Sequence, residues 1–205
     1  MAKKEIKEQK GFSVVELILS MTLILVLLAV VSTIFADAVG IRDRESSKTD
    51  ALTASQAALN VLSREISNSG YGLTHNGIVT ADSDESQLHF RTNSDNSDLT
   101  ISSPGEDVTY FFDTATNSIV RYDPNDTPQT SAVINRVSSV TFQYFDYFGA
   151  SSTPTLSDTA STNTGRVRVT VTVILDEVQG QPTGQTVTYT SDVTLRNSNY
   201  MLNQY

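Results

Sequence analysis

The sequence predicts an α+β protein in which one long N-terminal helix packs on a C-terminal antiparallel β-sheet domain. Two observations lead to this fold class. An uncharged apolar run from Leu17 to Ala36 is followed by apolar residues at helical spacing as far as Ile66. After Tyr71 the apolar residues alternate with polar ones, which is typical of strands covered on one face. We therefore expect a transmembrane first half and an amphipathic second half of the helix, followed by a β-rich head.

Charge is distributed unevenly along the 205 residues, which carry 14 Lys and Arg against 23 Asp and Glu. Residues 1–11 have a local charge of +2, so the remainder carries −11 of the net −9. A basic tip before an apolar run favours a cytoplasmic N-terminus and export of the rest. The acidic body argues against nucleic acid as a partner, because phosphate binding needs clustered Lys and Arg. Cysteine is absent, which excludes disulfides, thiolate metal sites and cysteine nucleophiles.

The run from Leu17 to Ala36 is long enough to cross a membrane. Its twenty residues contain no charge, proline or glycine, and a helix of that length rises about 30 Å, the thickness of the hydrocarbon core. Glu16 directly precedes the run, where a carboxylate is costly without a partner. Gly11 lies before the run and no small-residue cleavage site follows it, unlike an ordinary secretory signal. Composition alone favours an uncleaved signal anchor.

The segment Gly11-Phe12-Ser13-Val14-Val15-Glu16-Leu17 resembles the class III signal of type IV pilins and of type II secretion pseudopilins. In that family a prepilin peptidase cleaves after the glycine and methylates the new N-terminal phenylalanine. The resemblance implies cleavage between Gly11 and Phe12, N-methylation of Phe12, and a glutamate, Glu16, at the family's fifth mature position. It also implies the pilin fold, with an inner-membrane span before assembly and a periplasmic or extracellular filament afterwards.

This resemblance suggests a physical role for Glu16. A new α-amino group at Phe12 would be a cation in an apolar assembly, and each of the two charges is costly without the other. A neighbouring subunit shifted along the filament axis would place its own Phe12 amine against Glu16. We therefore expect Glu16 to set register during assembly, as buried polar residues do in coiled coils.

Four segments follow from this pattern: a leader at 1–11, a transmembrane and filament-core helix at 12–36, an exported amphipathic helix at 37–68, and a β-rich globular head at 69–205. Gly40 is a candidate bend, since glycine weakens a helix by about 1 kcal/mol relative to alanine. Glycines 70 and 72 suit the helix end. The predicted apolar stripe of the second helical half consists of Leu52, Leu59, Leu62 and Ile66.

Strands are predicted from alternation at 88–91, 108–112, 119–122, 137–148, 166–175 and 185–195, and the last two form a hairpin. Residues 113–117 are a turn-like connector. Adjacent aromatic residues at 144–148 point to opposite faces of their strand, so about half are expected in the core. Residues 149–165 contain nine Ser or Thr and are predicted to be a mobile surface loop, with an adhesive edge as the alternative.

Three further stretches are similar to W-type minor pilins (the PilW family) and J-type minor pseudopilins. They are residues 58–72, residues 140–146 and residues 193–197. The resemblance implies a position in a tip or initiation complex. The absence of cysteine departs from the major pilins, which often close a C-terminal loop with a disulfide.

Catalytic and metal-binding residues are not expected. The two histidines, His75 and His89, lack any nucleophile motif around them, so the chain is not predicted to be an enzyme and no cofactor is implied. Residues 82–85 and 93–98 are rich in oxygen ligands, as calcium sites are, but they lack the glycine and terminal glutamate of an EF-hand. Asp, Asn and Ser in such runs are mainly turn formers.

The sequence therefore predicts a minor pilin or pseudopilin that assembles or initiates a type IV pilus or a secretion pseudopilus. Its partners would be other such subunits, the prepilin peptidase, and the inner membrane before assembly. Two alternatives remain open. One is an adhesin-like subunit that binds a surface through residues 149–165, and the other is an uncleaved single-pass signal-anchored envelope protein.

Overall fold

The computed structural model describes residues 11–95, 100–149, 152–178 and 182–202. It confirms the predicted α+β fold class, with the long helix α1 (Val14–Ser67) followed by antiparallel sheets. Residues 1–10 of the predicted leader lie outside the described residues. The shorter helices are η1 (Thr80–Asp82) and α2 (Asn199–Leu202). The strands are β1 (Gln87–Arg91), β2 (Asp107–Asp113), β3 (Ser118–Tyr122), β4 (Thr130–Asn135), β5 (Val137–Asp146), β6 (Thr155–Ser157), β7 (Thr164–Ile174) and β8 (Thr186–Thr194).

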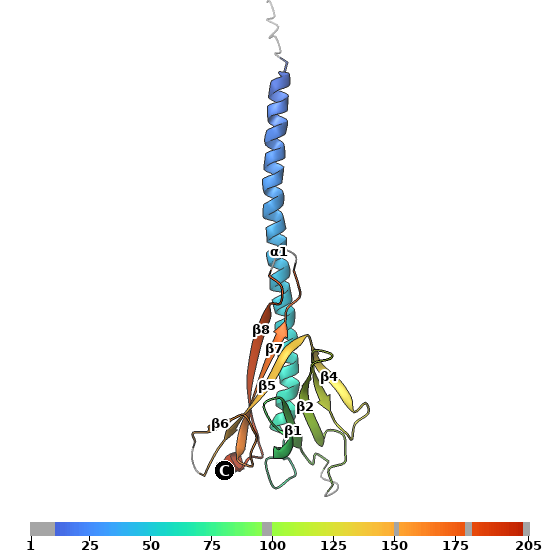
Figure 1. The fold of residues 1–205 in the computed structure, drawn as a ribbon, viewed down its shortest axis with the longest axis vertical. Coiled ribbons are helices and arrows are strands. Elements are labelled where there is room, and N and C mark those ends of the chain that lie inside the picture. The colour runs from blue at the N-terminus through green and yellow to red at the C-terminus, as the bar shows by residue number, and fades with distance from the viewer. Residues whose placement is uncertain (1–10, 96–99, 150–151, 179–181, 203–205) are drawn as a thin grey trace, which may run out of the picture.

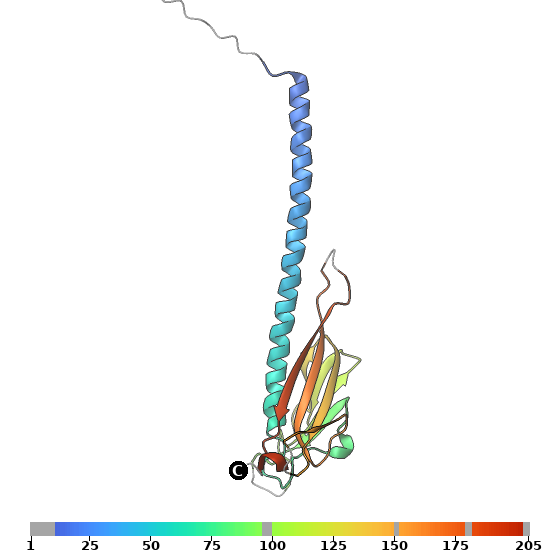
Figure 2. The same cartoon turned by 90° about the vertical axis from the view of Figure 1, so that its left-hand side faces the viewer.

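Helix α1 projects far beyond the head, which packs along one side of its C-terminal part (Figures 1 and 2). Its 54 residues run through Gly40 without a break. The helix ends at Ser67 with Asn68 as its C-cap, and Gly70 follows with a φ of 78°, a left-handed conformation that glycine adopts readily. The predicted helix end is therefore confirmed, whereas Gly40 does not interrupt the helix.

The buried face of α1 begins at Ser47, and every described residue from Val14 to Val39 is exposed. Leu59, Leu62 and Ile66 are buried as predicted, but Leu52 is 38% exposed. The first turns of the buried face instead use small residues, Ala51 and Ser55, which allow the helix to approach the sheet closely. The spacing of apolar residues alone could not show that Ala51, and not Leu52, faces the sheet.

The strands form two four-stranded antiparallel sheets instead of the one sheet expected. Their orders are β1-β2-β3-β4 and β6-β5-β7-β8. The predicted hairpin is confirmed, since β7 pairs with β8 from Arg166↔Thr194 to Ile174↔Thr186. Strand β4 was not predicted because four of its six residues are exposed and it has no alternating pattern.

The core lies between α1 and the inner faces of the sheets. On β7 the four alternate valines from Val167 to Val173 are buried, while Thr170 and Thr172 face outward, as the alternation predicted. The sheet β1-β2-β3-β4 contributes Leu88, Phe90, Val108 and Tyr110 to the same core cluster. Helix α1 packs against β7, β8 and β4.

The aromatic residues at 144–148 depart from the predicted alternation at two positions. Tyr144 is fully buried, but Phe148, which alternation would place on the same face, is 55% exposed because β5 ends at Asp146. Phe145 faces the outer side but is nevertheless buried, because the guanidinium groups of Arg166 and Arg168 lie 4.0 and 5.0 Å from its ring centroid. A cation–π contact thus covers an aromatic ring that the sheet leaves open.

The connector at 149–165 is not the mobile loop that its composition predicted. It contains strand β6, which pairs with β5. The Asn76 amide donates hydrogen bonds to the backbone carbonyls of Ser161 and Thr164, each at 3.0 Å. The Ala160 N–H donates to the Ser83 carbonyl at 3.3 Å. These contacts are made by distant loops, which a local pattern does not show.

We expect Leu62→Ala to lower the free energy of unfolding by about 2–5 kcal/mol, since Leu62 is fully buried between helix and sheets. Denaturant unfolding of the full chain in detergent measures this loss. The neighbouring Val61 is 38% exposed, so Val61→Ala should cost less than about 1 kcal/mol. Equal losses in both variants would contradict the assigned buried face.

Candidate assembly site

The first half of α1 presents an apolar surface that the head does not cover. Among its exposed side chains, Leu25 is 62%, Ile34 63% and Phe35 70% accessible. Soluble monomers rarely expose a continuous apolar patch larger than a few hundred Å². The helix is long and apolar enough to cross a membrane. This surface therefore requires an apolar environment, either lipid or other protein.

The hydroxyl groups in this half are compatible with such an environment. Ser20 donates to the carbonyl of Leu17 at 2.9 Å, and Thr33 donates to that of Val30 at 2.8 Å. Thr22 donates to the carbonyl of Ile18 at 3.0 Å. Because these hydroxyls donate to carbonyls of the same helix, they need no hydrogen bond from water. Their burial in lipid would therefore leave no hydroxyl donor unsatisfied.

Glu16 closes a capping box at the start of α1. The Ser13 N–H donates to Glu16 Oε2 at 3.1 Å, and Ser13 Oγ accepts from the Val15 N–H at 3.3 Å. The carboxylate also lies at the positive end of the helix dipole. Glu16 thus has a partner within its own chain, which the sequence analysis missed although Ser13-x-x-Glu16 is the spacing of a capping box.

The predicted cleavage bond lies just outside the helix. Gly11, Phe12 and Ser13 precede the first helical residue, and Phe12 is 82% exposed. Among the described residues, a Cβ atom added at Gly11 would meet no atom within 4 Å. Packing in this part of the chain therefore does not require a glycine at this position.

A polar segment of α1 separates the apolar half from the head. Glu45 and Lys48 form an i, i+3 ion pair at 2.9 Å. The head begins at Ser47, whose Oγ accepts from the Asp176 N–H at 2.9 Å. The 33 residues from Val14 to Ser46 span about 50 Å, compared with about 30 Å for a hydrocarbon core. The head therefore stays well clear of any bilayer that holds the apolar half.

Both histidines have structural partners. His89 lies between two carboxylates, with Nε2 2.5 Å from Asp107 Oδ1 and Nδ1 3.2 Å from Asp82 Oδ2. Arg91 Nε also contacts Asp107 at 3.3 Å. Burial would raise the pKa of Asp107, but the hydrogen bonds from His89 and Arg91 outweigh it and hold this pKa below its ordinary value. His75 Nδ1 accepts from the Gly77 N–H at 3.0 Å.

The oxygen-rich stretches form turns. Asp84 accepts hydrogen bonds from the side chain and backbone of Ser86, which lower its pKa. Asp95 Oδ2 accepts from Ser103 Oγ at 2.6 Å, and residues 96–98 lie outside the described residues. Glu106 is fully buried and accepts four backbone N–H groups, from Ser94, Asp95, Ser102 and Ser103. Within the described ranges, no cluster of three or more His, Cys, Asp or Glu is arranged to hold a metal ion.

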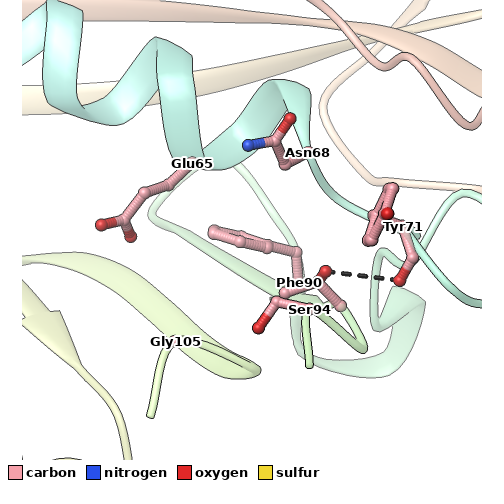
Figure 3. A pocket seen from close by; sticks show the side chains of 7 residues that line it. Glu65, Asn68, Tyr71, Phe90, Ser94 and Gly105 are labelled. Carbon is pink, nitrogen blue, oxygen red and sulfur yellow. Dashed lines mark hydrogen bonds between the residues drawn. The ribbon is translucent and has the colours of Figure 1, made fainter. Parts of the chain in front are cut away.

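A pocket of about 300 Å³ opens at the end of α1 that lies farthest from the apolar half (Figure 3). It is lined by Glu65, Asn68, Tyr71, Phe90, Thr92, Ser94 and Gly105. Beside it, Glu65 Oε2 accepts from the Tyr110 hydroxyl at 2.7 Å and from Arg121 Nε at 3.0 Å. Burial beside Glu65 raises the pKa of Tyr110. These partners are 45 and 56 positions from Glu65, so no local sequence pattern connects them.

Comparison with models of known protein families, with curated protein sequences and with solved structures finds no match to this chain. The arrangement itself is a long apolar N-terminal helix packed on antiparallel sheets, and it is compatible with a pilin fold.

We expect Asp107→Asn to flatten the dependence of stability on pH below about pH 4. The folded pKa of Asp107 lies below its ordinary value of 3.8. Its stabilising contribution is therefore complete above the unfolded pKa and is lost as pH falls through the folded pKa. Urea midpoints of the full chain measured from pH 6 to pH 2 test this. The exposed control Asp158→Asn should keep the wild-type slope, and an unchanged slope in Asp107→Asn would contradict the pairing.

Proposed function

We propose that this chain is a minor pilin or pseudopilin, a structural subunit of a thin filament at a bacterial envelope. The observation that carries the proposal is the uncovered apolar half of α1, which starts at a capped helix terminus directly after Gly11-Phe12. Such a surface must be covered by something outside the chain. A membrane covers it before assembly, and neighbouring helices cover it in the filament.

The surroundings of Gly11 support processing by a prepilin peptidase. The glycine is open on all sides and serves no packing purpose within the described chain. The bond to Phe12 lies in a non-helical segment, where a peptidase can reach the backbone. An enzyme that recognises the small residue before the cleaved bond accounts for a glycine that the fold does not need.

The proposal places the N-terminus in the cytoplasm and the head outside the inner membrane before assembly. The basic tip and the acidic body agree with that orientation. The partners are other pilin or pseudopilin subunits. The W- and J-type resemblances favour a position in the tip or initiation complex.

Co-expression with a prepilin peptidase should remove residues 1–11 and leave N-methylated Phe12, as mass spectrometry of the purified chain would show. We expect Gly11→Val to block cleavage by filling the space before the scissile bond. Gly40→Ala is the control, since it also adds a side chain at a glycine but lies far from the cleaved bond, at a half-buried position of α1. An intact leader on the wild-type chain would instead support the signal anchor.

Two substitutions of Glu16 separate capping from charge pairing. Glutamine can still accept the Ser13 N–H in a capping box, whereas alanine cannot. We expect Glu16→Gln and Glu16→Ala both to insert in the membrane and both to be reduced at least about tenfold in sheared filaments, because neither offers a charge to the Phe12 amine. Wild-type incorporation of Glu16→Gln, measured by immunoblotting, would show that capping alone matters.

A further inference from the structure

Glu65, which lines the pocket beyond the last turn of α1, belongs to a charged network with more carboxylates than guanidinium groups. Arg121 is the one guanidinium that binds Glu65, Asp123 and Asp126, at 3.0, 3.1 and 3.4 Å. Three carboxylates therefore share one positive charge within the described network. Asp123 is fully buried and Glu65 lines the pocket, with 27% of its side chain exposed. The low dielectric around these groups strengthens their attraction for a further cation.

One exposed aromatic ring, one buried aromatic ring and one carboxylate border the same space. Figure 3 shows the Phe90 ring extending toward Glu65, with Tyr71 on the other side of the pocket. Tyr71 is 59% exposed, whereas Phe90 is 1% exposed and belongs to the core cluster. Asn68 forms another wall, and its Oδ1 accepts from Arg196 at 3.3 Å, outside the lining. An exposed aromatic ring beside a carboxylate provides two attractions for an organic cation, one to the ring face and one to the negative charge.

We propose that this pocket binds a primary ammonium group carried on an alkyl chain, with Glu65 as its anion and Tyr71 along its stem. The pocket is at the lower end of the size range of small-molecule sites, so it suits one unbranched chain rather than a large ligand. The source of the ammonium is a lysine side chain of a partner protein or a free diamine. The proposal is independent of how α1 assembles.

Calorimetric titration of the full chain in an uncharged maltoside detergent tests the proposal. The probes are Nα-acetyl-lysine methylamide, the norleucine analogue that lacks the ammonium, and 1,5-diaminopentane. We expect saturable binding of the two amines and none of the norleucine compound. Stronger binding of the lysine derivative would indicate a protein partner, and stronger binding of the diamine would indicate a free amine.

Tyr71→Ala is the decisive variant, because Glu65 also holds Tyr110 and Arg121 and its loss would disturb folding. We expect Tyr71→Ala to weaken amine binding about tenfold. Tyr122→Ala removes another exposed tyrosine outside the pocket lining and should leave binding unchanged. The proposal would be overturned if neither amine saturates the wild-type chain, if the norleucine analogue binds equally well, or if Tyr71→Ala binds as the wild type does.

Discussion

The packing of α1 from Ser47 to Ile66 against the sheets is the contact on which the rest of the structure depends. It fixes the head at one end of the helix and leaves the segment from Val14 to Ser46 largely without cover. The uncovered part divides into an apolar portion and a charged portion. The apolar portion requires lipid or protein around it, while the charged portion keeps the head away from that layer. The function proposed for the chain follows from this division of one helix.

A polar contact joins the sheet β1-β2-β3-β4 to the same helix. Glu65 on the last turn of α1 binds Tyr110 on β2 and Arg121 on β3, at 2.7 and 3.0 Å. Partly buried charges of this kind are costly unless they are paired, so the network specifies how the sheet is placed on the helix. Glu65 also lines the neighbouring pocket. Structural pairing and the proposed amine site thus share this one carboxylate.

Patterns within a segment predicted most of the fold, whereas contacts between segments could not be predicted. The alternating valines of β7 and the uncharged run before Asp37 determine their elements locally. The burial of the small residues Ala51 and Ser55 depends on what packs against them. Strand β6 likewise depends on its pairing with β5, so composition alone wrongly predicted a mobile loop at 149–165. The pairing of Glu65 with Arg121 joins residues 56 positions apart. Glu16 was singled out from the sequence as a carboxylate that needs a partner, whereas its capping role was missed although the Ser13-x-x-Glu16 spacing fits a capping box.

The most direct test of the account asks what surrounds the apolar half of α1 in the assembled state. The chain has no cysteine, so Leu25→Cys introduces a single thiol in the centre of that surface. Sheared filaments would be treated with a short thiol-reactive photocrosslinker, with Thr170→Cys on the outer sheet face as control. The account predicts crosslinks from position 25 to the N-terminal helix of another subunit, in chains that begin at Phe12. Recovery of Leu25→Cys only from the membrane fraction, with residues 1–11 retained and crosslinked to lipid alone, would contradict it.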